Sequence, residues 1–171
     1  MMNTNLAKFL AEFLGTYALV FFGCGSMILN EINPSSISVD SIPIIFGLIV
    51  AVMIYTFGTI SGAHFNPAVS FVFWLKRELS TDRCTLYIIF QCLGAIAGVI
   101  LAHAMFDQSL IQTGVKIRFG SNIWLSESIA TFGLVATILT GLRHKPESVP
   151  SLVSLYITAG YWFTSSTSFA N

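Results

Sequence analysis

The chain has 171 residues, of which 54% are hydrophobic and 9% are charged. A soluble domain is about 25% charged, so this chain is too apolar for water, and its 15 phenylalanines argue against disorder. The formal net charge of zero removes the electrostatic basis for nucleic-acid binding, and the three cysteines have neither metal-site spacing nor an even count. The composition predicts a membrane protein.

Five apolar runs are long enough to cross a bilayer, which takes about 20 residues. They are approximately Leu6–Leu29, Pro43–Ile60, Cys84–Phe106, Ile123–Leu142 and Ser151–Phe169. Glu12 would interrupt a signal peptide, so we expect the first run to be a retained span. Gly94 and Gly98 in the third run have the spacing typical of close helix contact. The connecting segments are short, and we expect one transmembrane domain over residues 1–171.

The basic residues predict an orientation. With a cytoplasmic N-terminus, six of the eight Lys and Arg residues fall inside, as the positive-inside rule requires. The six are Lys8, Lys76, Arg77, Arg83, Arg143 and Lys145, and the two outside are Lys116 and Arg118.

The segment after the second run has a different character. Residues 61–65 are mostly small, and Asn66-Pro67 then precedes about nine residues that are mainly apolar, which is half a crossing. Because Asn caps helices and Pro suits the first turn, we expect a re-entrant half-helix that begins at mid-membrane. Its positive end would repel cations and hold a neutral molecule by hydrogen bonds. The alternative is that Asn66-Pro67 is only a turn, as we expect for Asn33-Pro34 in its polar loop.

The sequence also repeats internally. Residues 11–20 match residues 126–135, and Glu12 and Glu127 occupy equivalent places. The second copy begins three crossings after the first, so the two halves have opposite orientations, an arrangement that places a working site at mid-membrane. We expect the first repeat to cover about residues 1–106 and an incomplete second repeat about residues 122–171.

These motifs resemble the aquaporin, or major intrinsic protein, family. The resemblance rests on Ala11-Glu12-Phe13-Leu14-Gly15-Thr16, on Ser61-Gly62-Ala63-His64-Phe65-Asn66-Pro67-Ala68-Val69 and on Glu127. It implies an all-α membrane protein with an aquaporin-like inverted-repeat bundle of five transmembrane helices and one re-entrant half-helix. The second half-helix and the sixth span would be missing, since the chain would be truncated at the second Asn-Pro-Ala motif. A homotetramer in contact with lipid, in a plasma membrane such as the bacterial inner membrane, is also implied.

The resemblance assigns roles to particular residues. The pore motif would comprise Asn66, Pro67, Ala68 and Asn171, in which the two asparagines donate hydrogen bonds to the passing molecule and Pro67 and Ala68 pack the half-helices together. Three residues would brace the loops, namely Glu12, Glu127 and His64. The selectivity filter would include Phe46, Ala159 and Ser168. This lining is wider and less polar than a water-only filter, which favours small neutral solutes such as glycerol or hydroxylated metalloids such as arsenite.

The principal hypothesis is therefore a passive channel for water or small neutral solutes. One alternative is a non-conducting fragment or pseudogene product. Another is a proton-coupled secondary transporter that uses Glu12 and Glu127, because acids within a membrane are often functional. The sequence contains no nucleophile–base pair, metal cluster or phosphate loop. We expect no enzymatic activity, no catalytic residue, no cofactor, no metal and no nucleic-acid partner.

Overall fold

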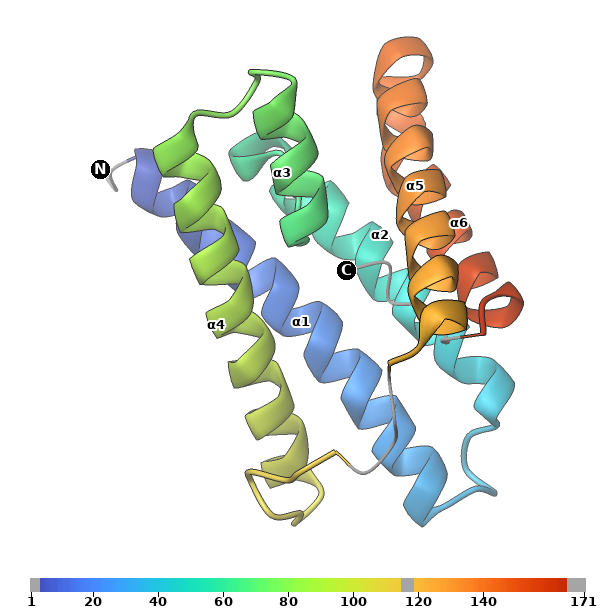
Figure 1. Ribbon diagram of the computed structural model, residues 1–171. Coiled ribbons are helices and arrows are strands. Elements are labelled where there is room, and N and C mark those ends of the chain that lie inside the picture. The colour runs from blue at the N-terminus through green and yellow to red at the C-terminus, as the bar shows by residue number, and fades with distance from the viewer. Residues whose placement is uncertain (1–3, 115–118, 166–171) are drawn as a thin grey trace.

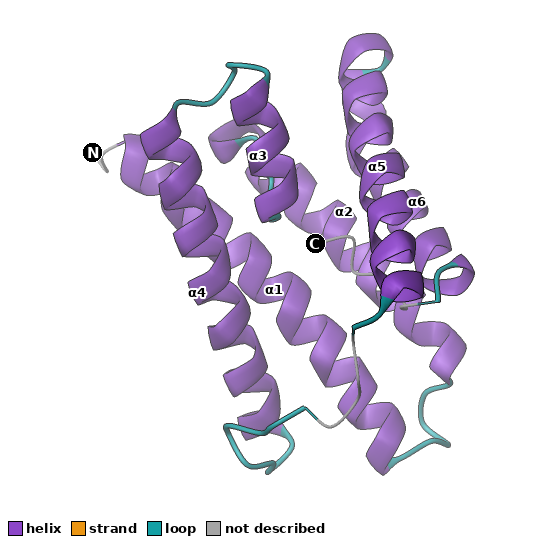
Figure 2. Cartoon of the chain, in the orientation of Figure 1, coloured by secondary structure: helices purple, strands orange, loops and turns teal. Residues whose placement is uncertain are grey.

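The computed structural model describes residues 4–114 and 119–165, and the elements in these ranges are all helical (Figures 1 and 2). The helices are α1 (Thr4–Ile32), α2 (Ile42–Ser61), α3 (Pro67–Leu75), α4 (Thr81–Met105), α5 (Ser121–His144) and α6 (Val149–Phe163). Short 3-10 turns, Val39–Ser41 and Pro146–Ser148, lead into α2 and α6. The predicted all-α fold class is confirmed, including the nine-residue half-helix α3.

Four of the five predicted spans are long and apolar enough to cross a membrane, namely α1, α2, α4 and α5. The fifth, α6, has 15 residues and ends at Phe163, so the expectation that it continues through residues 164–165 is wrong. The physical reason is local: Thr164 has extended backbone, and residues 164–168 are all Ser or Thr, which have low helix propensity. Residues 166–169 of the predicted run lie outside the described residues.

Helices α1 and α4 lie side by side along most of their length (Figure 1). A Cβ on Gly94 would overlap the backbone oxygen of Phe13, and a Cβ on Gly98 would lie 2.6 Å from the backbone oxygen of Tyr17. The two backbones therefore touch, which confirms the close helix contact predicted from the glycine spacing.

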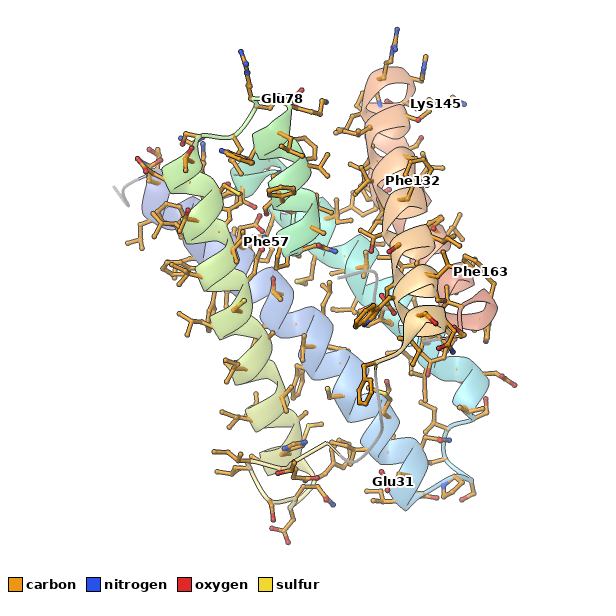
Figure 3. The ribbon with its side chains drawn as sticks, viewed as in Figure 1. Glu31, Phe57, Glu78, Phe132, Lys145 and Phe163 are labelled. Carbon is orange, nitrogen blue, oxygen red and sulfur yellow. The ribbon has the colours of Figure 1, made fainter. Side chains whose placement is uncertain are left out.

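The apolar core lies where the two halves of the described chain meet. It combines Leu19 of α1, Val50 of α2, Phe65 of the loop before α3, Leu134 of α5 and Val153 of α6. Figure 3 shows apolar side chains on the outer faces of the helices, while the labelled charged residues Glu31, Glu78 and Lys145 lie at the two ends of the bundle. This distribution suits a lipid environment.

Candidate functional site

The loop between α2 and α3 has a tightly specified backbone. Gly62 ends α2 in the left-handed region with φ 93°, and Ala63 and Phe65 also have positive φ, 51° and 49°. Glycine adopts this conformation freely, but the two non-glycine residues cost about 1–3 kcal/mol each and persist only where the surroundings over-determine them. One restraint is the Phe65 ring, which is buried directly against Gly15 of α1, where a Cβ would overlap it.

The second restraint is the carboxylate of Glu12, which is completely buried. Its Oε1 accepts hydrogen bonds from the Ser61 hydroxyl at 2.6 Å and from the His64 backbone N–H at 3.0 Å. Its Oε2 accepts from the Phe65 backbone N–H at 2.7 Å and from Gln91 Nε2 at 2.7 Å. One carboxylate thus satisfies two backbone donors of an irregular segment, which has no water to bond in a membrane.

Three further polar residues in this cluster were not singled out from the sequence. Gln91 Nε2 also donates to Ser70 Oγ at 3.0 Å, and the Tyr87 hydroxyl donates to the Ser61 carbonyl at 2.7 Å. Tyr87 and Gln91 are buried and four residues apart on α4, so they lie on one face of that helix. A glutamine inside an apolar span was the one sequence signal that pointed to this cluster.

His64 is fixed by its neighbours on the cavity side of the loop. Its Nδ1 lies 3.1 Å from Ser70 Oγ, and its ring lies 4.6 Å from the ring of Phe73 and 5.4 Å from that of Tyr87, measured between centroids. The residue also lines the cavity described below. The histidine therefore contacts both the half-helix and α4.

The start of α3 has the geometry that Asn-Pro favours. Asn66 has extended backbone, and its Oδ1 accepts hydrogen bonds from the N–H groups of Ala68 at 2.7 Å and Val69 at 3.2 Å. Pro67 occupies the first helical position, where its missing N–H costs nothing. Because the oxygen of the planar amide points to the helix, the amide nitrogen of Asn66 points away from it.

A largely enclosed cavity of about 80 Å³ adjoins this helix start. It has room for several water molecules or one small polyol. All parts of the bundle except α4 contribute to its wall, and the lining includes Leu19, Phe46, Val50, Ile54, Val69, Phe73, Leu134, Ile138, Leu142, Val149, Val153 and Ile157. The polar part of the wall consists of the loop with His64 and Asn66. The cavity therefore has mostly apolar walls and one polar end.

The predicted filter residues have different positions. Phe46 is buried and lines the cavity, whereas Ala159 on α6 is exposed and does not contribute to the lining. On α6 the cavity-facing residues recur every four positions, Val149, Val153 and Ile157. Ser168 and Asn171 lie outside the described residues, and the filter and second pore motif stay predictions.

Glu127, the counterpart of Glu12 in the second repeat, is less buried than Glu12 and lies beside a groove. It is half-buried on α5 and borders an open groove of about 530 Å³ between α5 and α3. The groove is also lined by Val72, Ser128, Thr131, Phe132 and Val135. The structure thus brings together Glu12, His64 and the first pore motif, and places Glu127 on a separate surface.

Comparison with known proteins defines the class. The family model for the major intrinsic protein matches residues 2–165, so the chain belongs to the major intrinsic protein family, as the sequence motifs predicted. Aquaglyceroporin AqpS of Rhizobium meliloti (strain 1021) is 50% identical over 163 residues, which are 94% of this chain and 70% of AqpS. Nodulin-26 of Glycine max is 36% identical over 78% of this chain and 50% of its own length.

The fold agrees with that of a solved member. The X-ray structure of the aquaglyceroporin from Plasmodium falciparum superposes with a TM-score of 0.78 at 25% sequence identity, covering 93% of this chain and 73% of that one. The chain thus spans between half and about three quarters of the length of these relatives.

Proposed function

We propose that the protein is a passive transmembrane channel for water and small neutral solutes. The observation that carries this proposal is the largely enclosed cavity, which has mostly apolar walls and adjoins the capped start of the half-helix. Membership of the major intrinsic protein family and the similarity to a protein named an aquaglyceroporin support it.

The chemistry of the cavity favours neutral solutes. The N-terminus of α3 carries the positive end of its helix dipole, which repels cations, and the Asn66 amide nitrogen is a donor for a solute oxygen. Apolar side chains form most of the remaining wall, so a charged solute would lose its hydration without compensation. Asn171 would supply the second amide, while Pro67 and Ala68 would pack the two half-helices together.

The solute class follows from the proposed filter. As proposed from the sequence, Phe46, Ala159 and Ser168 would form a lining wider and less polar than a strict water filter, which suits glycerol-like molecules and arsenite-like metalloids. Of these, Phe46 lines the cavity, whereas Ala159 is exposed and lies outside its lining. Glu12, Glu127 and His64 would act as loop-bracing residues rather than as proton carriers. The four hydrogen bonds that the Glu12 carboxylate accepts support this role.

The assembly we propose is a homotetramer in contact with lipid, with one passage in each subunit and a cytoplasmic N-terminus, in a plasma membrane such as the bacterial inner membrane. Lys76 and Arg143 border one shared groove, so two basic residues assigned to the cytoplasm lie on the same side of the bundle. This agrees with the positive-inside rule.

The test measures the flux of water, glycerol and arsenite across the membranes of vesicles that carry the protein as its native gene encodes it. Stopped-flow light scattering should show water and glycerol permeability above that of empty vesicles, and arsenite uptake should rise as well. Asn66→Ala should lower these fluxes by removing the donor at the cavity. Asn33→Ala is the matched control, because Asn33 lies in a polar loop and accepts from the Ser35 hydroxyl at 2.7 Å.

Two results would contradict the proposal. One is flux no greater than that of empty vesicles. The other is uphill uptake that follows a pH gradient and disappears in Glu12→Gln, which would make the protein a coupled transporter.

A further inference from the structure

The contact between α2 and α6 is unusually close at Gly47. A Cβ at this position would overlap the Thr158 hydroxyl and would lie 3.1 Å from the Ser154 backbone oxygen. Without a side chain at Gly47, the polar groups of α6 can reach the backbone of α2. The two helices therefore meet through hydroxyls and carbonyls at this point.

Two hydroxyl groups of α6 bond to carbonyl groups of α2. Ser154 Oγ donates to the Gly47 carbonyl at 2.7 Å. The single proton of Thr158 Oγ1 is shared between two acceptors, the Ser154 carbonyl of α6 at 2.9 Å and the Pro43 carbonyl of α2 at 3.3 Å. Pro43 and Gly47 are four residues apart, so both bonds fall on one side of α2. Between them in the sequence is Phe46, whose backbone is fixed on either side.

The ring of Phe46 is restrained from the opposite direction. A Cβ on Gly23 of α1 would lie 3.2 Å from Cδ2 of this ring, so the ring rests on the bare backbone of α1. Phe46 is 8% exposed and borders the cavity. The backbone on either side of Phe46 thus bonds to α6, and its ring packs against α1. Both contacts restrict its movement.

The facing wall of the cavity belongs to α6 itself. Val153 and Ile157 line the cavity, and each is the immediate neighbour of a hydroxyl residue that bonds to α2. A shift of α6 relative to α2 would therefore change the distance between these two side chains and Phe46. In a bilayer, helix separation is set by small residues and interhelical hydrogen bonds rather than by the hydrophobic effect.

We propose that Ser154 and Thr158 are positioning residues for Phe46, and that their bonds to the Gly47 and Pro43 carbonyls set the largest solute that can pass. This inference rests on the proposed channel function. Neither residue needs to touch the solute, because each acts through the placement of Phe46 against the α6 wall.

The test compares glycerol permeability with that of the larger polyol mannitol in proteoliposomes of the native protein. Ser154→Ala combined with Thr158→Val should lower the glycerol-to-mannitol ratio about threefold. This is the factor expected for loss of one typical interhelical hydrogen bond, that of Ser154, because the Thr158 proton is shared with a carbonyl of its own helix. The conservative pair Ser154→Thr and Thr158→Ser retains both hydroxyls and should keep the ratio. Tyr156→Phe is the matched control, because it removes a 2.9 Å bond from α6 to the Ala130 carbonyl of α5.

A second measurement separates positioning from general loosening. If the two hydroxyls act through Phe46, their removal should leave the ratio unchanged in a Phe46→Ala background. An unchanged ratio in the original double variant would overturn the inference, as would an equal effect of Tyr156→Phe or an undiminished effect in the Phe46→Ala background.

A spectroscopic measurement on the Phe46 ring tests the inference without any measurement of solute flux. A 4-fluoro label on the Phe46 ring, observed by ¹⁹F NMR in detergent, should show a shifted or additional resonance in the Ser154→Ala, Thr158→Val variant and not in Tyr156→Phe. If the native protein passes no solute, the proposed function fails while this readout still decides the positioning. An unmoved resonance in the double variant would overturn it.

Discussion

Glu12 and Glu127 come from matching segments of the two repeats, yet their surroundings differ. Glu12 is fully buried and accepts four hydrogen bonds from the loop, α2 and α4. Glu127 is half-buried beside an open groove. The partners of the first carboxylate, Ser61 and Gln91 among them, are not part of the repeated segment. The repeated motif therefore specifies a helix and the position of its glutamate. The residues that hydrogen-bond to the glutamate come from other segments of the chain.

The residues beside these acids differ in the same way. Gly15, three residues after Glu12, leaves space for the Phe65 ring of the loop. Ala130, three residues after Glu127, keeps its Cβ, and its carbonyl accepts the Tyr156 hydroxyl of α6 at 2.9 Å. Gly15 thus packs against the loop before α3, whereas Ala130 contacts helix α6.

The largest expected effect is the difference in unfolding free energy between substitutions of Glu12 and Glu127. Glu12→Ala removes the shared acceptor of the His64 and Phe65 N–H groups, and each buried donor left unsatisfied costs about 1–3 kcal/mol. We expect a loss of about 3 kcal/mol or more, measured by thermal unfolding in detergent micelles. Glu127→Ala should cost less than Glu12→Ala, because Glu127 is only half-buried and borders an open groove. Equal losses would mean that the two acids have the same structural weight.

A smaller effect is expected from the helix contacts. Gly94→Ala places a Cβ on the backbone of Phe13, which is unable to move aside, so we expect a cost of about 2–3 kcal/mol. The Cβ of Gly141→Ala in the second repeat would lie closest to side-chain atoms of Val149 and Leu152, at 3.0 and 3.3 Å, while the nearest backbone atom, the Val149 Cα, is 4.0 Å away. Since those side-chain atoms can shift, the change should stay within about 1 kcal/mol. The same unfolding measurement would refute this contrast if Gly141→Ala were the more damaging.

Features with a local cause were predictable from the sequence. The start of α3 follows from the capping chemistry of Asn66 and the fixed φ of Pro67, and the α1–α4 contact follows from the spacing of Gly94 and Gly98. The end of α6 was predicted too late, because the overall apolar count outweighed the Ser and Thr residues at positions 164–168.

Features that depend on distant partners were not predictable. Gln91 reaches Glu12 across 79 positions, and Thr158 reaches Pro43 across 115. No local pattern encodes such pairings, since they depend on how whole helices pack. A polar residue within an apolar run shows only that a partner is needed, not which one.

A still smaller effect on stability, together with an effect on solute flux, should distinguish Gly15 from its counterpart Ala130. Gly15→Ala would push the Phe65 ring, and with it the loop before Asn66, at a net cost of about 1–2 kcal/mol and with reduced solute flux. Phe65→Leu should partly restore flux in that background, because the smaller side chain makes room. Ala130→Gly should cost about 1 kcal/mol through helix propensity, together with the packing of its buried Cβ, and should leave flux unchanged. Flux that is insensitive to Gly15→Ala would argue against the ring contact as a restraint on the loop.

The smallest expected effect concerns Gln91, the residue that completes the buried cluster of the first repeat. Its Nε2 donates two hydrogen bonds, whereas its Oε1 is buried without a hydrogen-bond partner among the described residues. Gln91→Met would lose two bonds worth about 1 kcal/mol each but would also remove an unsatisfied oxygen that costs about 1–3 kcal/mol. These terms nearly cancel, so the unfolding free energy should change by less than about 1 kcal/mol. A loss as large as that of Glu12→Ala would show that the carboxylate depends on Gln91 more than on the loop it holds.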